Sequence, residues 1–177
     1  MRNVKDILIA ALALTVICAV AVAALAGTNL LTADTIAAAE QAATETACRE
    51  VLPEAAAFET VDGDFADGVL EVYRASATDG AVCGYVVKTS TVGKSSGLVV
   101  MTGVAADGTV AGVAVVSDGE TAGYIDTVTK GGLLDRLKGV TDVSTVDGVS
   151  QATKSSNGIK KGVALALETV KGVDVDG

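Results

Sequence analysis

The sequence predicts an α+β fold, in which an antiparallel β meander packs with helices and is preceded by one N-terminal transmembrane helix. Three observations carry this prediction. The first is an uncharged apolar run near the N-terminus. The second is a series of short Val-rich runs separated by Asp-Gly pairs, which are hairpin signals. The third is a set of apolar residues with helical spacing on both sides of these runs.

The apolar run from Ile7 to Ala26 is long enough to form a membrane-spanning helix. At a rise of about 1.5 Å per residue it covers roughly 30 Å, the thickness of the hydrocarbon core. Arg2 and Lys5 precede this run, and the next basic residue is Arg49. The positive-inside bias then places residues 1–6 in the cytoplasm. We therefore expect a single-pass protein of the cell membrane with an extracytoplasmic C-terminal domain.

A cleaved secretory signal is the alternative interpretation of this segment. Ala24-Leu25-Ala26 resembles a cleavage site at the end of an apolar stretch. The apolar run is longer than the about 7 to 15 residues typical of such signals, which favours a membrane anchor. Either interpretation delivers the following domain to the same side of the membrane.

Residues 27–60 are expected to form a linker and a juxtamembrane helix. Thr32 or Asp34 can cap this helix, and Pro53 ends it. The apolar positions of the helix recur at steps of three and four, at Ile36, Ala39, Ala43, Ala47 and Val51. The extracytoplasmic domain is then expected to occupy residues 61–177.

The meander is expected to contain four strands, with helices on one face of the sheet. The strands are Val69 to Arg74, Val82 to Thr89, Leu98 to Val104, and Val110 to Val116. The expected core positions on them are Val72, Val86, Val100 and Val113. A short amphipathic segment follows, with Leu133, Leu134 and Leu137. A last helix presents apolar residues on one side, at Ile159, Val163, Ala166, Leu167 and Val170.

The composition excludes several classes of chemistry. The chain has 22 acidic and 13 basic residues and a net charge of −9, which argues against nucleic acid as a partner. It has no His, which excludes Ser-His-Asp and Cys-His nucleophile systems. Cys48 and Cys83 lie outside the membrane segment and form no CxxC pair, so we expect small buried hydrophobic side chains rather than ligands. We expect no metal site and no catalytic side chain.

The segment from Asp147 to Ser156 is a hydroxyl-rich loop immediately before the last helix. It contains one lysine, Lys154, and feeds a helix N-terminus whose backbone N–H groups and positive dipole end favour an anion. A phosphate group fits such a site. The alternative is an ordinary helix start, with a cap from Ser155, Ser156 or Asn157 and with Ser150 and Thr153 facing water.

The same segment resembles the flavinylation motif of the FMN-binding domain family, D-x-x-S/T-G-A-T followed by x-T/S-S. Six positions match the motif: Asp147, Ser150, Ala152, Thr153, Ser155 and Ser156. Gln151 stands where the family prefers Gly, which would restrict the backbone of the loop. The resemblance implies that FMN is joined through its phosphate to the hydroxyl of Thr153. A separate flavin transferase would install it, and Asp147 would contribute to recognition by that enzyme.

The resemblance also assigns further residues to the flavin site. Lys154 would offset the phosphate charge, and Ser150 and Ser155 would donate hydrogen bonds to the phosphate. The neighbouring Gln151, Ala152 and Ser156 would complete this part of the site.

A second segment, Glu120-Thr121-Ala122-Gly123-Tyr124, resembles the E-T-P-G-L-G loop that borders the flavin in this family. Ala122 replaces Pro and Tyr124 replaces Leu. Gly97 and Leu98 fall where the family has a Gly-rich stretch and are expected to complete the pocket, whereas Lys160 and Lys161 are expected on a solvated helix face.

Together with the membrane helix and Val51-Leu52-Pro53, these segments are most similar to the G subunits of Rnf ferredoxin:NAD oxidoreductase complexes. The C subunits of sodium-translocating NADH:quinone reductases are near relatives. The resemblance implies an electron-transfer subunit of an ion-translocating complex, with other membrane and peripheral subunits as partners. A flavin supplies redox chemistry that these side chains lack. Two alternatives stay open: a membrane-anchored module that binds an anionic ligand without redox chemistry, and a stand-alone extracytoplasmic flavoprotein.

Overall fold

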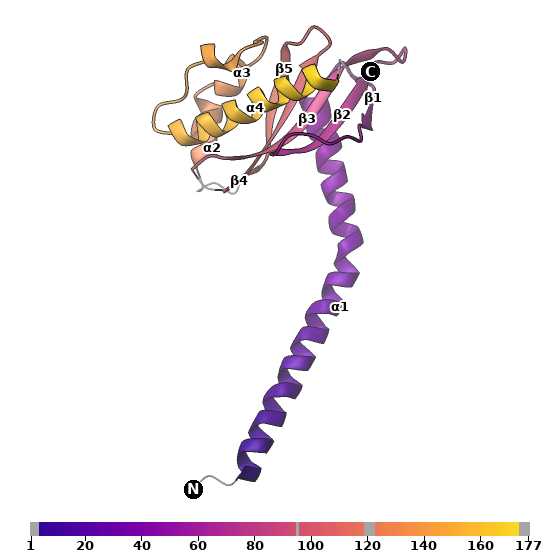
Figure 1. The fold of residues 1–177 in the computed structure, drawn as a ribbon, viewed down its shortest axis with the longest axis vertical. Coiled ribbons are helices and arrows are strands. Elements are labelled where there is room, and N and C mark those ends of the chain that lie inside the picture. The colour runs from indigo at the N-terminus through magenta and orange to yellow at the C-terminus, as the bar shows by residue number, and fades with distance from the viewer. Residues whose placement is uncertain (1–3, 95, 119–122, 174–177) are drawn as a thin grey trace. The chain divides into compact units, whose positions relative to one another are not determined.

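The computed structural model of the chain describes residues 4–94, 96–118 and 123–173. These residues belong to two compact units, Met1–Ala42 and Ala43–Gly177. Figure 1 shows the elements in chain order. They are α1 (Val4–Val51), β1 (Ala57–Thr60), β2 (Val69–Ser76), β3 (Val82–Val92), β4 (Ser96–Ala105), β5 (Val110–Asp118), α2 (Tyr124–Lys130), α3 (Leu133–Arg136), the 3-10 turn η1 (Val143–Thr145) and α4 (Thr153–Val173).

Helix α1 continues through Thr32 and Asp34, so the prediction of a separate helix capped at one of these residues was wrong. The sequence offers no proline between the membrane segment and Pro53 that would end the helix. The hydroxyl of Thr28 donates to the carbonyl of Ala24 at 2.9 Å, a contact within the same helix. One helix thus takes the place of the expected helix, linker and second helix.

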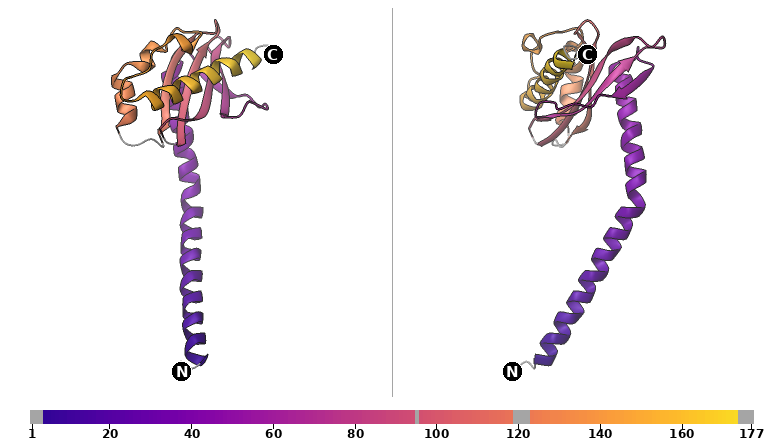
Figure 2. Two further views of the ribbon diagram at one scale, coloured as in Figure 1. Left: turned by 60° about the vertical axis from the view of Figure 1, so that its left-hand side comes forward. Right: turned by 45° about the vertical axis from the view of Figure 1, so that its right-hand side comes forward.

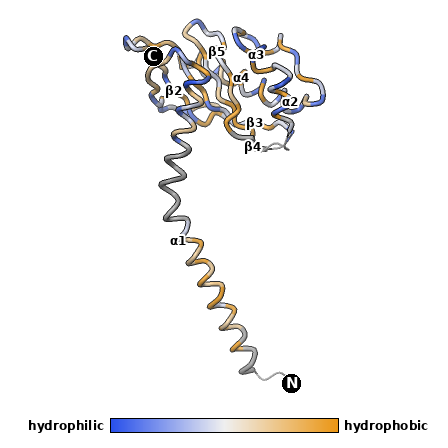
Figure 3. Tube along the Cα trace, turned by 180° about the vertical axis from the view of Figure 1, so that it is seen from behind, coloured by the Kyte–Doolittle hydropathy of each residue, from blue (hydrophilic) through white to orange (hydrophobic). Residues whose placement is uncertain are grey.

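One part of α1, Ala11–Thr28, is long and apolar enough to cross a membrane, with a mean hydropathy of 2.3. Its 18 residues span about 27 Å as a helix. Figure 3 shows this apolar stretch along the lower part of the helix. Large apolar side chains stand exposed on it, at Leu12, Leu14, Val16, Ile17, Val20, Val22 and Leu25. Such side chains are stable in lipid rather than in water, which agrees with the predicted membrane helix.

The five strands form a single antiparallel sheet in the order β1-β2-β3-β4-β5. This meander confirms the predicted α+β architecture, and β2 to β5 lie where the hairpin signals placed them. The edge strand β1 was not predicted. It pairs Ala57–Thr60 with the second half of β2, Tyr73 to Ser76. Four residues are too few to show a period-two pattern, so only the pairing reveals this strand.

Helix α4 covers one face of the sheet, as Figures 1 and 2 show. All of its predicted core positions are buried: Ile159, Val163, Ala166, Leu167 and Val170. They pack with Val72, Val100 and Val113 from the sheet. Gly162 brings the helix close to β3, because a Cβ atom at this position would lie 2.8 Å from the hydroxyl oxygen of Thr89. The predicted face of α4 is therefore confirmed.

The opposite face of the sheet is covered as well, by the last turns of α1. The expectation that helices lie on one face only was therefore wrong. Cys48 and Val51 of α1 pack here with Val86, Met101 and Ala114. Successive side chains of a strand point to opposite faces, so Val86 belongs to this second cluster and not to the one under α4.

Cys48 gives a test of this second cluster, because its side chain is only 1% exposed. Burial, together with the nearby carboxylates of Glu71 and Glu45, raises the pKa of the Cys48 thiol to about 11. At pH 8 roughly one thiol in a thousand is then a thiolate, the form that reacts with alkylating reagents.

We expect a variant that keeps only Cys48 (Cys18→Ala, Cys83→Ala) to resist maleimide at pH 8 in its native state and to react fully after denaturation. Mass spectrometry of the labelled protein measures both. A matched variant that keeps only Cys83, whose side chain is half-buried, should react faster. Equal labelling of native and denatured Cys48 would contradict the packing of α1 against the sheet.

Candidate functional site

The motif predicted from the sequence lies at the start of α4. The carbonyl of Ala152 accepts the N–H of Ser156 at 2.9 Å, which closes the first turn of the helix. Thr153 is the first helical residue, and its side chain is exposed. The N-terminal backbone N–H groups of this 21-residue helix and its positive dipole end therefore lie beside an accessible hydroxyl group.

The loop before α4 is held against the first turn of the helix. The N–H of Val149 donates to the hydroxyl oxygen of Ser156 at 3.1 Å, and the N–H of Ala152 donates to the Val149 carbonyl at 3.2 Å. The methyl groups of Val149 lie over Gly131, where a Cβ atom would be 2.6 Å from one of them. Ser156 is fully buried and holds the loop, whereas Ser150 and Asp147 are exposed.

A pocket of about 270 Å³ opens at this end of α4. Five of its lining residues belong to the motif: Gln151, Ala152, Thr153, Lys154 and Ser155. The sixth is Lys94, in the turn between β3 and β4. None of these six residues carries a carboxylate, although the whole chain has a net charge of −9. Two lysines and a helix N-terminus make this pocket suitable for an anion.

Lys94 was not predicted as a site residue. It lies far from the motif in the sequence, and only the packing of α4 on the sheet brings the two together. Gly97 and Leu98, which were predicted, are described but do not line this pocket. Leu98 is fully buried beneath the start of α4, where its side chain lies close to Gly158. Gly97 is exposed and has a left-handed φ of 93°.

Gln151 has a φ of 70° and is the one non-glycine residue with positive φ in the described part of the chain. This left-handed conformation costs an L-residue with a Cβ atom about 1–2 kcal/mol, and Gly does not carry this penalty. The structure thus gives a physical reason why a glycine suits this position of the motif. With glutamine at this position, the hydrogen bonds of Val149 and Ala152 on either side hold the loop in the left-handed conformation.

We expect Gln151→Gly to raise the free energy of unfolding by up to about 1 kcal/mol, because removal of the backbone strain exceeds the added entropy of the unfolded chain. The resemblance to the flavinylation motif predicts covalent attachment of FMN, and the relaxed loop should then be modified as fast as the wild type or faster. Thermal unfolding of the full chain in detergent measures the first effect, and a timed gel assay measures the second. Gln151→Ala, which keeps the Cβ atom, should show no gain. A lower melting temperature for the glycine variant would contradict this account.

The second predicted segment reaches the same end of the domain through α2. Glu120 and Thr121 lie outside the described residues. Gly123, with a left-handed φ of 89°, precedes α2, and Tyr124 is the first residue of that helix. Helix α2 contacts α4 and lies beside its start (Figure 2). Its seven residues span about 10 Å, and Gly131, which follows the helix, lies beneath Val149 of the motif loop.

Two lysines further along α4, Lys160 and Lys161, differ in their exposure to solvent. Lys161 is exposed, as predicted. Lys160 is half-buried, and its ammonium group donates to the carbonyl of Val146 at 2.5 Å, so the prediction of a solvated position was wrong for this residue. The contact ties α4 to the chain just before the motif.

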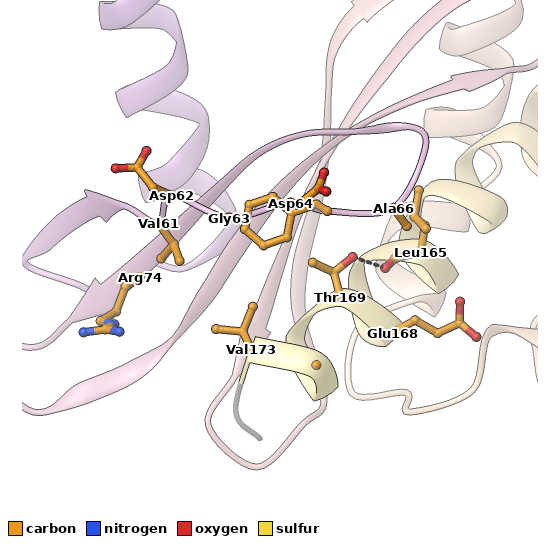
Figure 4. A pocket seen from close by; sticks show the side chains of 12 residues that line it. Val61, Asp62, Gly63, Asp64, Ala66, Arg74, Leu165, Glu168, Thr169 and Val173 are labelled. Carbon is orange, nitrogen blue, oxygen red and sulfur yellow. Dashed lines mark hydrogen bonds between the residues drawn. The ribbon is translucent and has the colours of Figure 1, made fainter. Parts of the chain in front are cut away.

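A larger pocket of about 480 Å³ lies at the other end of α4, between its last turns and the segment that follows β1 (Figure 4). Its lining includes three carboxylates, Asp62, Asp64 and Glu168, and one cationic group, Arg74. Three carboxylates disfavour a phosphate by charge repulsion. The smaller pocket beside Thr153 is therefore the candidate site for an anionic cofactor.

Comparisons with known proteins show which families this chain resembles, and over which residues. A family model described as FMN-binding domain matches residues 93–168, and a model described as RnfG N-terminal region matches residues 1–51. The G subunit of the ion-translocating oxidoreductase complex of Methanosarcina acetivorans is 30% identical over 183 residues, which cover 96% of this chain and 97% of the relative.

A second relative is the G subunit of the Na(+)-translocating ferredoxin:NAD(+) oxidoreductase complex of Acetobacterium woodii. It is 39% identical over 125 residues, which cover 63% of this chain but only 60% of the relative. The FMN-binding match includes Lys94 and every residue of the motif loop, whereas the N-terminal match ends at the last residue of α1.

Proposed function

Because the chain belongs to the family of G subunits of ion-translocating oxidoreductase complexes, we propose that it is a membrane-anchored flavoprotein that transfers electrons within such a complex. The observation that carries this proposal is the position of Thr153. Its exposed hydroxyl lies at the N-terminus of α4 in a pocket with two lysines and no carboxylate, inside the segment matched by the FMN-binding family model. These features suit the phosphate of FMN.

In this proposal FMN is attached to Thr153 by a phosphoester bond. A flavin transferase would use FAD as the donor: the Thr153 oxygen bonds to the phosphorus of the FMN half, the bond between the two phosphates breaks, and AMP leaves. The hydroxyl proton is released to a base of the transferase or to water. The exposure of Thr153 supports access by that enzyme, and the motif loop around it supplies the recognition surface.

The attached phosphate keeps one negative charge, which the residues of this chain can stabilise. The N–H groups at the start of α4 and the ammonium group of Lys154 are the available partners. A helix N-terminus contributes typically 0.3–1 kcal/mol to such an interaction at an exposed site, roughly a two- to fivefold effect. The covalent bond, rather than these contacts, would retain the cofactor.

The flavin, when bound, supplies one- and two-electron transfer, which the side chains of this protein cannot. The residues of the chain bind and orient it, and the membrane helix keeps it at the surface of the complex. In the predicted orientation the domain is extracytoplasmic, where a dissociated flavin would be diluted and lost. A covalent bond has a clear advantage there. The immediate partners in this proposal are the other membrane and peripheral subunits of the complex.

The proposal is tested by the mass of the intact protein. The full chain is purified from membranes of cells that co-express a flavin transferase, and in parallel from cells that lack it. We expect a mass increase of one FMN less one water in the first sample only, with yellow fluorescence that persists in a denaturing gel. A mass equal to the sum of the amino acids in both samples would overturn the covalent attachment of FMN to Thr153.

The same preparation separates two alternatives. A chain without covalent flavin that binds inorganic phosphate would be an anion-binding module. A flavinylated chain that purifies in mild detergent without other membrane subunits would be a stand-alone carrier. Co-purification of several polytopic subunits with the flavinylated chain supports the proposed role in a complex.

A further inference from the structure

We propose that Lys94, at the tip of the β3–β4 turn, binds the phosphate of the FMN attached at Thr153 and so positions the flavin from the sheet side of the pocket. This inference rests on the proposed function, because it takes the phosphate to lie at Thr153. It adds a residue outside the motif, contributed by a different element of the fold.

The first observation is that Lys94 shares the pocket with the motif. The lining of this pocket comes from two places in the chain: the start of α4 with its preceding loop, and Lys94. Lys154 alone would offer one ammonium group next to Thr153, on the same helical turn. Lys94 adds a second ammonium group from a separate element, and two cationic donors can bind different oxygens of one phosphate.

The second observation is that Lys94 lies in a short connection between two paired strands. In the pairing of β3 with β4, Val92 is opposite Ser96, so the connection between the two strands contains only three residues. Lys94 is the middle one. A hairpin connection this short restricts the place of its central Cα atom. The side chain therefore starts from a defined point rather than from a long loop.

The third observation is that Gly158 of α4 allows the β3–β4 turn to pack closely against the helix. A Cβ atom at position 158 would lie 2.9 Å from the Cα atom of Gly93 and 3.0 Å from the carbonyl oxygen of Val92. Both are backbone atoms that cannot rotate away. Only glycine allows this approach, which places the turn next to the first turns of α4, where Thr153 and Lys154 lie. The packing that forms the core thus also brings Lys94 to the phosphate site.

The first experiment measures flavinylation of the full chain over time with a purified transferase and FAD. Loss of one charge-assisted contact to the phosphate should slow modification of Lys94→Gln by about three- to tenfold, while Lys94→Arg stays near the wild type. Lys161→Gln, which removes an exposed charge elsewhere on α4, serves as the matched control and should match the wild type. A Lys94→Gln variant modified at the wild-type rate counts against the inference.

The second experiment needs no transferase and therefore separates this inference from the proposed function. In the full chain with Thr153→Ala, quenching of flavin fluorescence reports the binding of free FMN and of riboflavin, which lacks the phosphate. We expect tighter binding of FMN than of riboflavin, and we expect Lys94→Gln to remove most of that difference at low salt while riboflavin binding stays unchanged.

The outcomes of the two experiments are distinct. Equal binding of FMN and riboflavin, or no binding of either, overturns the role of Lys94. A phosphate preference that depends on Lys94 supports it, even if the wild type is never flavinylated and the covalent proposal fails. If the wild type is flavinylated but Lys94→Gln changes neither the rate nor the FMN preference, the proposed function stands and this inference falls.

Discussion

Thr153→Ala is expected to give a folded, membrane-inserted chain that carries no covalent flavin. The hydroxyl oxygen of Thr153 is the atom that the phosphoester bond requires, so its loss should abolish attachment rather than reduce it. Folding should be preserved, because the side chain is exposed and Ala has a high helix propensity at the first position of α4. Intact mass and in-gel fluorescence after co-expression with the transferase measure the effect.

Two variants serve as controls for this experiment. Thr153→Ser keeps a hydroxyl group at the same backbone position and should retain part or all of the modification. Thr129→Ala removes an exposed threonine of α2 and should be modified like the wild type. A flavin that remains bound to the denatured Thr153→Ala chain would show that attachment occurs at another residue.

Gly112→Ala is expected to have the largest effect on stability. Gly112 of β5 and Gly103 of β4 are paired neighbours in the sheet, and the last residue of α1, Val51, lies over both. A Cβ atom on Gly112 would lie 2.6 Å from the carbonyl oxygen of Val51 and 2.8 Å from its Cα atom. These are backbone atoms, so the end of α1 would have to move away from the sheet.

We expect this overpacking to lower the free energy of unfolding by about 1–3 kcal/mol, the range typical when an extra carbon group is inserted into a well-packed core. Thermal unfolding of the full chain in detergent, followed by circular dichroism, measures it. Gly172→Ala is the matched control, because a Cβ atom there meets nothing within 4 Å and the residue lies in helix α4. It should be neutral or slightly stabilising. A melting temperature of Gly112→Ala equal to that of the wild type would contradict the described contact.

Features that depend on neighbouring residues could be predicted from the amino-acid sequence. The apolar run predicted the membrane helix, and the Asp-Gly pairs predicted four of the five strands. The spacing from Ile159 to Val170 predicted the buried face of α4. The motif was placed correctly at the start of that helix, but Thr153 to Ser156 form the first turn of α4 rather than the loop before it. In each case the signal is either a periodic spacing of apolar residues or a typical turn sequence. Such a signal is contained within about 20 consecutive residues.

Features that join distant parts of the chain emerged only from its folded arrangement. The end of α1 covers the second face of the sheet, and the short strand β1 forms its edge. Lys94 reaches the pocket of Thr153 because Gly158 lets the β3–β4 turn approach α4. The local pattern of a strand or helix shows which residues are apolar, but not which partner covers them. That choice follows from backbone approach and side-chain packing between segments far apart in the sequence.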